Sequence, residues 1–340
     1  MTKKRFSLLL DDDAPTQEQG ATMPQTNVTE DKPRLSIMDN EEEKKSEKIP
    51  FSRKLNYWLI QNKTPFLHRT YGISINYNNQ KSIQYLLEVK CMGYKKGIFT
   101  YILSRKRFFK DGKQLEGILE QLAEQSANCL YPLQVSVNEQ GQIIGVTNQE
   151  DIKKRWEALK PELSKLYAGK PFKRHSATMD KVIDSPERIL KSLNNDVVYD
   201  ILFSKLYFNY SKAFTQPLEK QFKWFSGIQK IRFQGVQTLN KIVKENGRML
   251  INYKGIMKPT SGLTEGATDI EYQLDAKDHT LLRVDGTFKY STSNSNKTIQ
   301  FKAIWQQNID NTEARKIDDK KRKGIYIDPN AETKWYEFWK

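Results

Sequence analysis

The sequence predicts an α+β protein, in which antiparallel β-meanders pack with amphipathic helices behind a disordered N-terminal arm. Three observations support this fold class. Apolar and polar residues alternate in several short segments, and apolar residues recur at helical spacing in others. Residues 1–50 are rich in Gln, Thr, Glu, Asp, Lys and Pro and contain almost no aromatic side chains, so they bury too little to offset the entropy of ordering.

Two sets of alternating segments predict the strands. The first meander is expected in YGISINY (71–77), IQYLLEV (83–89) and GIFTYIL (97–103), and a hairpin in LQVSVNEQGQIIGV (133–146). The second meander is expected in DIEYQLD (269–275), LLRVDGTFKY (281–290) and IQFKAIW (299–305). We expect KIRFQGVQTL (230–239) and RMLINYKGIMK (248–258) to join that second sheet.

Helical spacing of apolar residues predicts helices between these strands. Residues 51–60 place Leu55, Trp58 and Leu59 at helix spacing, and order should begin there. Residues 113–130 form an amphipathic pattern whose apolar face contains Leu115, Ile118, Leu119, Leu122 and Cys129.

The next helices carry recognisable terminal signals. Residues 147–167 begin with Asn148 as an N-cap, and Pro161 should bend or split this helix. Residues 184–193 begin with Ser185 as the cap and Pro186 in the first turn. The apolar and aromatic residues 196–214 should be core, whether they form a helix or a strand.

The predicted organisation has four parts. Residues 1–50 form the arm, residues 51–210 an α+β domain or half, and residues 211–307 a mainly antiparallel β domain or half. Residues 308–340 form a charged tail that ends in the aromatic cluster KWYEFWK. The pattern leaves open whether the two halves are one domain or two.

Charge is unevenly distributed along the chain. Residues 1–50 hold eight Lys and Arg against eleven Asp and Glu, which leaves 48 against 30, or +18, for the rest. Such a balance fits an acidic protein partner, nucleic acid, an anionic membrane or solubility alone. Basic residues mix with aromatics in residues 104–113 and 222–235, but the alternation favours a solvated strand face over a nucleic-acid surface.

The residues that usually carry catalysis are sparse. The three histidines, His68, His175 and His279, are isolated from one another, and neither a C-x-x-C nor an H-x-x-x-H spacing occurs. Cys91 and Cys129 should be free buried thiols. There is no phosphate-binding loop and no G-x-S-x-G turn, so we expect no cofactor, no metal and no enzymatic activity. No apolar run is long enough to span a membrane, which favours the cytoplasm, with export by a specialised machine left open.

The arm contains two copies of a short motif in which a basic residue is followed by apolar residues and then by acidic ones. The two copies are Arg5, Phe6, Ser7, Leu8 and Leu9, followed by acids, and Arg34, Leu35, Ser36, Ile37 and Met38, followed by acids. Chance is one explanation. The other explanation is a tandem linear motif that binds one or more proteins, either by adding a strand to a sheet or by docking as a helical turn. Once one copy is bound, the flexible tether raises the effective local concentration of the other copy.

The region from 95 to 210 resembles a group of uncharacterised bacterial proteins. The likeness rests on a helix that ends in a Cys-x-Tyr-Pro pattern, a glycine-centred hairpin and an N-x-x-x-I-x-x-R-W helix, here Cys129, Tyr131, Pro132, Gly141, Asn148, Ile152, Arg155 and Trp156. Such proteins are encoded beside PAAR-like spike and Rhs-type toxin genes of contractile, type VI-like secretion systems. The resemblance implies at most a loading, adaptor or structural role, and no catalytic residue can be carried over from it. From the residues alone, Arg155 is expected at the rim of the packing made by Trp156.

These observations predict a non-enzymatic protein-interaction component, either an adaptor, a loading chaperone or a structural part. A nucleic-acid-binding protein that uses the basic folded region is the alternative, and an exported toxin with an unrecognised site is a second one.

Overall fold

The computed structural model describes residues 59–62, 67–78, 80–210, 212–223, 230–244, 246–257, 263, 265–291 and 296–307. The chain divides into two units, Met1–Trp305 and Gln306–Lys340, and every described helix and strand belongs to the first. Among the described residues the strands are β1 (His68–Tyr77), β2 (Lys81–Lys95), β3 (Ile98–Lys110), β4 (Leu133–Asn138), β5 (Ile143–Val146), β6 (Thr215–Phe222), β7 (Ile231–Leu239), β8 (Arg248–Met257), β9 (Glu265–Asp275), β10 (Leu281–Ser291) and β11 (Asn296–Trp305). The helices are α1 (Ile118–Asn128), α2 (Gln149–Leu166), α3 (Lys170–Ile183), α4 (Pro186–Leu193) and α5 (Val197–Leu202).

All these strands form one antiparallel sheet in the order β5-β4-β3-β2-β1-β11-β10-β9-β8-β7-β6. The two predicted meanders, the hairpin and the placement of β7 and β8 are confirmed. The meanders are joined by pairing between β1 and β11, where Tyr71 lies opposite Trp305 and Ile75 opposite Phe301. The fold is therefore mainly β, with both predicted halves contributing strands to a single sheet.

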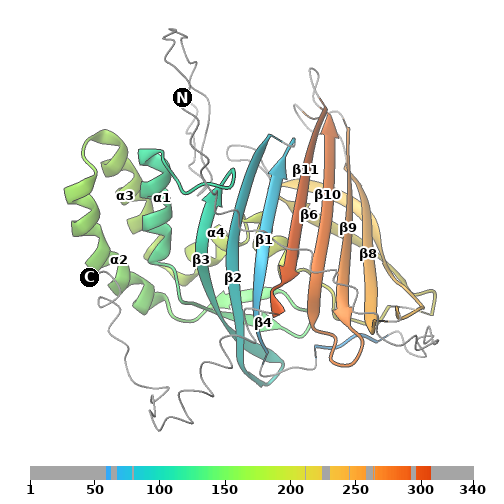
Figure 1. Cartoon of the computed structure of the whole chain (residues 1–340). Helices are drawn as coiled ribbons and strands as arrows, with labels where there is room; N and C mark the ends of the chain where they lie inside the picture. The colour runs from blue at the N-terminus through green and yellow to red at the C-terminus, as the bar shows by residue number, and fades with distance from the viewer. Residues whose placement is uncertain are drawn as a thin grey trace, which may run out of the picture. The chain divides into compact units, whose positions relative to one another are not determined.

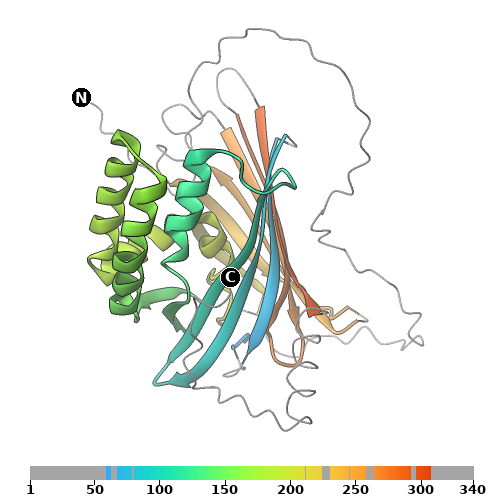
Figure 2. The ribbon, with the colours of Figure 1, turned by 60° about the vertical axis from the view of Figure 1, so that its left-hand side comes forward.

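The hydrophobic core lies on one face of this sheet, which we call the inner face. Alternation places Ile73 of β1, Val284 of β10 and Phe301 of β11 there, all fully buried. Figures 1 and 2 show α1, α2 and α3 gathered on one side of the twisted sheet. Helix α5 is buried along nearly its whole length, and Leu206 and Tyr210 after it are buried too, so the expected core contribution is confirmed for residues 196–210, whereas Lys212 and Ala213 are exposed.

Details of helices α1 and α2 differ from what the sequence predicts. Ile118 and Leu119 are 70% and 57% exposed. Helix α1 begins only at Ile118, and its buried residues are Leu122, Ser126 and Ala127. The first turn of the helix, which contains Ile118 and Leu119, therefore does not pack against the core. Helix α2 is not split at Pro161, which was one of the two alternatives expected there, because burial of its apolar stripe on both sides of the proline outweighs the one backbone hydrogen bond that proline removes.

The expected caps divide into one that forms and one that does not. Ser185 accepts a hydrogen bond from the Arg188 backbone N–H and caps α4 as predicted. Asn148 precedes α2, but its side chain makes no capping bond, because it is engaged elsewhere. Leu59 forms an isolated β-bridge with Asn209 instead of a helical turn. Leu55 and Trp58 lie outside the described residues.

Candidate functional site

The residues that carry the sequence resemblance hold the connection between α1 and β4. Arg155 on α2 donates from Nε to the Cys129 carbonyl at 2.9 Å and from an Nη atom to the Pro132 carbonyl at 3.0 Å. Asn148 donates to the same Pro132 carbonyl at 2.8 Å and accepts from the Gln134 backbone N–H at 2.8 Å. From the sequence, Arg155 was expected only at the rim of the packing made by Trp156. In the structure it also binds the connection between α1 and β4. It satisfies carbonyls that helix and strand leave without partners.

The other residues of that pattern also have structural contacts. The Trp156 indole donates to Asp180 at 2.7 Å, while its ring is buried. Burial raises the pKa of Cys129 to about 12, so it is a thiol at neutral pH. Gly141 has a φ of +94°, and a Cβ there would lie 2.9 Å from the Tyr207 ring. The contacts of the residues that carry the resemblance therefore stabilise the fold.

The histidines and cysteines do not converge. His68 lies 2.7 Å from Glu88, and His279 contacts the Gln61 carbonyl at 2.8 Å. Burial lowers the pKa of His175. Both cysteines are free and buried, as predicted. Within the described ranges no three His, Cys, Asp or Glu residues come together as a metal site.

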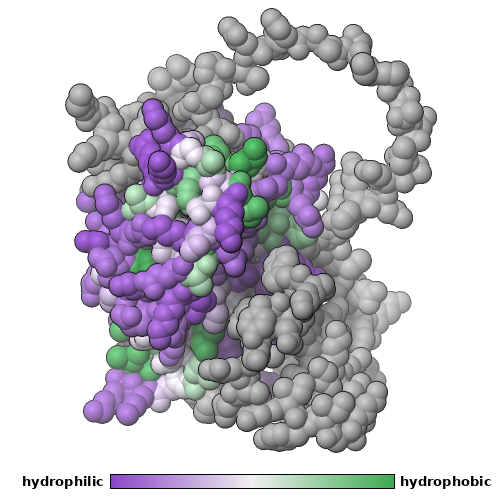
Figure 3. Space-filling model, turned by 90° about the vertical axis from the view of Figure 1, so that its left-hand side faces the viewer, coloured by the Kyte–Doolittle hydropathy of each residue, from purple (hydrophilic) through white to green (hydrophobic). Residues whose placement is uncertain are grey.

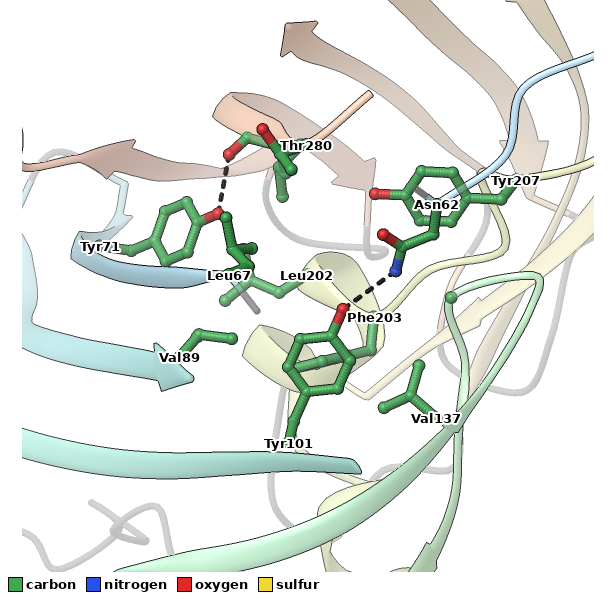
Figure 4. Close-up of a pocket in the computed structure, with 12 residues that line it drawn as sticks. Asn62, Leu67, Tyr71, Val89, Tyr101, Val137, Leu202, Phe203, Tyr207 and Thr280 are labelled. Atoms are coloured by element: carbon green, nitrogen blue, oxygen red, sulfur yellow. Dashed lines mark hydrogen bonds between the residues drawn. The ribbon is translucent and has the colours of Figure 1, made fainter. Parts of the chain in front are cut away.

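A small cavity lies between the inner face and the residues that follow α5 (Figure 4). Its volume is about 50 Å³. Tyr101 accepts a hydrogen bond from the Asn62 side chain at 2.9 Å, and Tyr71 donates to the Leu281 carbonyl at 2.7 Å. A cavity of this size holds a few water molecules, whereas pockets for substrates usually measure about 300 Å³ or more.

A buried cation, Lys220 of β6, lies on the inner face and is only 7% exposed. Its Nζ lies 2.5 Å from Ser204 Oγ and 3.3 Å from the Tyr272 hydroxyl. The rings of Tyr253 and Tyr272 lie 4.8 and 4.9 Å from the same atom. Burial lowers the pKa of Lys220 to about 7, because desolvation disfavours the ammonium.

A lysine beside a serine is an arrangement that can activate a hydroxyl nucleophile. Here Ser204 is also only 7% exposed, and neither residue lines the cavity of Figure 4. The arrangement therefore lacks the access that a nucleophile needs. This cluster was not expected from the sequence, although Lys220 alternates in phase with Leu218 and Phe222, which was the available signal.

The described parts of the two basic stretches identified in the sequence lie mainly on strands β3 and β7. In β3, Arg105 is largely buried, donates to Glu124 at 2.6 Å and lies over the Tyr131 ring at 5.3 Å. In β7, exposed Arg232 alternates with buried Ile231 and Phe233, as the strand interpretation predicted.

An exposed basic cluster lies instead where α2 ends and α3 begins. We call Lys165, Leu166, Lys170, Lys173 and Arg174 the α2–α3 corner. All five are exposed, and Leu166 is 71% exposed. Figure 3 shows that the helical side is mostly hydrophilic, with scattered apolar patches. This corner was not expected from the sequence.

The charges at the corner oppose the usual electrostatics of a helix start. Helix α3 has no acidic residue in its first turn, and its start carries Lys170, Lys173 and Arg174. Cations near a helix N-terminus are destabilising, whereas anions are favoured there. Elsewhere on these helices Lys160 pairs with Asp180 at 2.8 Å. In contrast, Lys165, Lys170 and Lys173 form no ion pair with any residue that the structure describes.

The ten residues predicted to bind a partner, Arg5–Leu9 and Arg34–Met38, lie outside the described residues. Among the described helices none is long and apolar enough to cross a bilayer. No model of a known protein family matches this chain, and no curated protein matches its sequence.

Proposed function

We propose that this protein is a non-enzymatic interaction component that binds an acidic protein partner through the α2–α3 corner. The observation that carries the proposal is the set of exposed cations at the start of α3 beside the exposed Leu166. Lys170 and Lys173 form no ion pair with any described residue, and each cation near the helix N-terminus costs about 0.3–1 kcal/mol, so these two lysines are not explained by the stability of the chain itself.

An acidic segment would relieve that electrostatic cost. Its carboxylates would face both the lysines and the partial positive charge of the α3 N-terminus. An apolar side chain beside the acids would cover Leu166, which offers exposed apolar area at the end of α2. The expected partner segment therefore combines acidic residues with at least one apolar residue.

The Lys220–Ser204 pair gives little support to a catalytic alternative, because neither residue lines the cavity of Figure 4. Lys220 contacts Ser204, and Arg105 contacts Glu124, so these groups are engaged with one another inside the fold. The resemblance to proteins encoded beside contractile secretion genes suggests an adaptor or loading role for such binding. The repeated motifs at 5–9 and 34–38 remain a predicted second binding site, for another protein.

Charge reversal at the corner tests this function. The full-length K165E/K170E/K173E variant is expected to bind a fluorescent poly-glutamate peptide at least about tenfold more weakly than the natural chain, measured by anisotropy. The matched control is K90E/K289E/K297E, which reverses three exposed lysines on strands and changes the net charge equally.

The control and a competitor decide the interpretation. Equal loss of affinity in both triple variants would mean that net charge alone drives binding. Tighter binding of single-stranded DNA than of the acidic peptide, with a steep salt dependence, would favour the nucleic-acid alternative and contradict the proposal.

A further inference from the structure

The segment after α5 runs across the inner face and contacts both meanders. We call residues 203–210 the strap. Leu206 donates its backbone N–H to the Gln140 carbonyl in the β4–β5 hairpin at 3.1 Å. Tyr207 donates its hydroxyl to the His279 carbonyl before β10 at 3.2 Å. The strap therefore links parts of the sheet that are distant in the strand order.

Polar groups attach the strap to strands β6, β7 and β9. Ser204 meets Lys220 and lies within reach of Tyr272. Gln237 on β7 donates to the Lys205 carbonyl at 3.1 Å and to the Tyr210 hydroxyl at 2.7 Å. Because these groups are buried, the attachment depends on each of them keeping its partner.

We propose that Lys220 makes attachment of the strap to the sheet pH-dependent, so that the strap is held when the amine is neutral and released more readily when it is charged. The geometry supports this. The groups that face Nζ are a hydroxyl from the strap, a hydroxyl and ring from β9 and a ring from β8. On β6 itself, the neighbouring Glu219 is exposed on the opposite face. Lys205 of the strap lies over the Phe208 ring at 5.6 Å.

The two charge states of Lys220 therefore have unequal surroundings. A neutral amine can accept from one hydroxyl and donate to the other. An ammonium gains some stabilisation from the two ring faces, but it has no carboxylate against it among these groups. Charging Lys220 is expected to draw water toward the buried site, and the strap is the segment that covers it.

The direction of the pH dependence follows from the lysine pKa. It is about 7 when the strap is attached, against about 10.4 for a solvated lysine. Between these values the detached state binds more protons, so attachment strengthens as pH rises above 7. Below 7 the penalty for burying the charge is fully present. The equilibrium constant for strap attachment should therefore increase about tenfold from pH 6 to pH 8.

Hydrogen exchange on the full chain tests the proposal. After correction for intrinsic exchange rates, strap amides of the natural protein should be about tenfold better protected at pH 8 than at pH 6. In K220M this difference should vanish, while K254M, which alters an exposed lysine on β8, should keep it. A natural protein with equal corrected protection at both pH values, or a K220M variant that keeps the difference, would overturn the proposal.

A second measurement on the natural chain guards against a K220M variant that does not fold. Carbon-13 NMR of labelled lysine side chains should show one lysine that titrates near pH 7, and the strap protection should follow the same midpoint. If every lysine titrates near 10, the tyrosine rings hold the ammonium in place and the proposed release does not occur.

Discussion

Replacing Gly235 with alanine is expected to destabilise the fold by about 3 kcal/mol or more, or to prevent folding. Gly235 of β7 lies opposite Gly255 of β8, and a Cβ at 235 would lie 2.1 Å from the Lys254 carbonyl oxygen and 2.6 Å from the Gly255 Cα. Both are backbone atoms, so no side-chain rotation relieves the contact. The two strands would have to separate and lose ladder hydrogen bonds.

Chemical denaturation measures this effect, with Gly145→Ala as the matched control. A Cβ at Gly145 of β5 would meet Ser136 Cβ at 3.8 Å, an ordinary van der Waals distance. We expect the control to lie within about 1 kcal/mol of the natural protein. Similar stabilities for G235A and G145A would show that β7 and β8 do not approach each other as closely as described.

Replacing Arg155 with methionine is expected to destabilise the protein by about 2–4 kcal/mol, because hydrogen bonds to a charged donor are worth about 1.5–3 kcal/mol each and the carbonyls of Cys129 and Pro132 lose that donor. Methionine keeps much of the apolar stem, so the loss reports mainly on the guanidinium contacts.

Lys154→Met is the control for Arg155, since Lys154 is the preceding residue on the same helix and is exposed. The free energy of unfolding of K154M should stay within about 0.5 kcal/mol of that of the natural protein. If R155M and K154M unfold at the same denaturant concentration, Arg155 does not hold the α1–β4 connection.

The strands were predictable because burial on one face imposes a period of two that is visible in single segments such as Tyr71, Ile73 and Ile75. Pairing between β1 and β11 was not, because it joins residues more than two hundred positions apart and no local pattern encodes it. The exposure of Ile118 and Leu119 was missed because helical spacing indicates a potential apolar face but not where the contact with the rest of the fold ends.

The candidate sites depend on information that the sequence carries only weakly. Lys220 sits at an inward position of its strand, yet a lysine in a charged segment is normally solvated, so composition suggested the opposite. The α2–α3 corner arises because only residues 167–169 separate the end of α2 from the start of α3. The repeated motifs at 5–9 and 34–38 lie outside the described residues and remain a prediction.

Lysine footprinting of the full-length chain tests the proposed binding surface most directly. Acetylation rates at Lys165, Lys170 and Lys173 would be compared by mass spectrometry with and without poly-glutamate peptide, beside those at Lys90, Lys289 and Lys297. The account predicts slower acetylation of the three corner lysines and unchanged rates at the three strand lysines. Protection of the strand lysines instead, or of neither set while the peptide is bound, would contradict it.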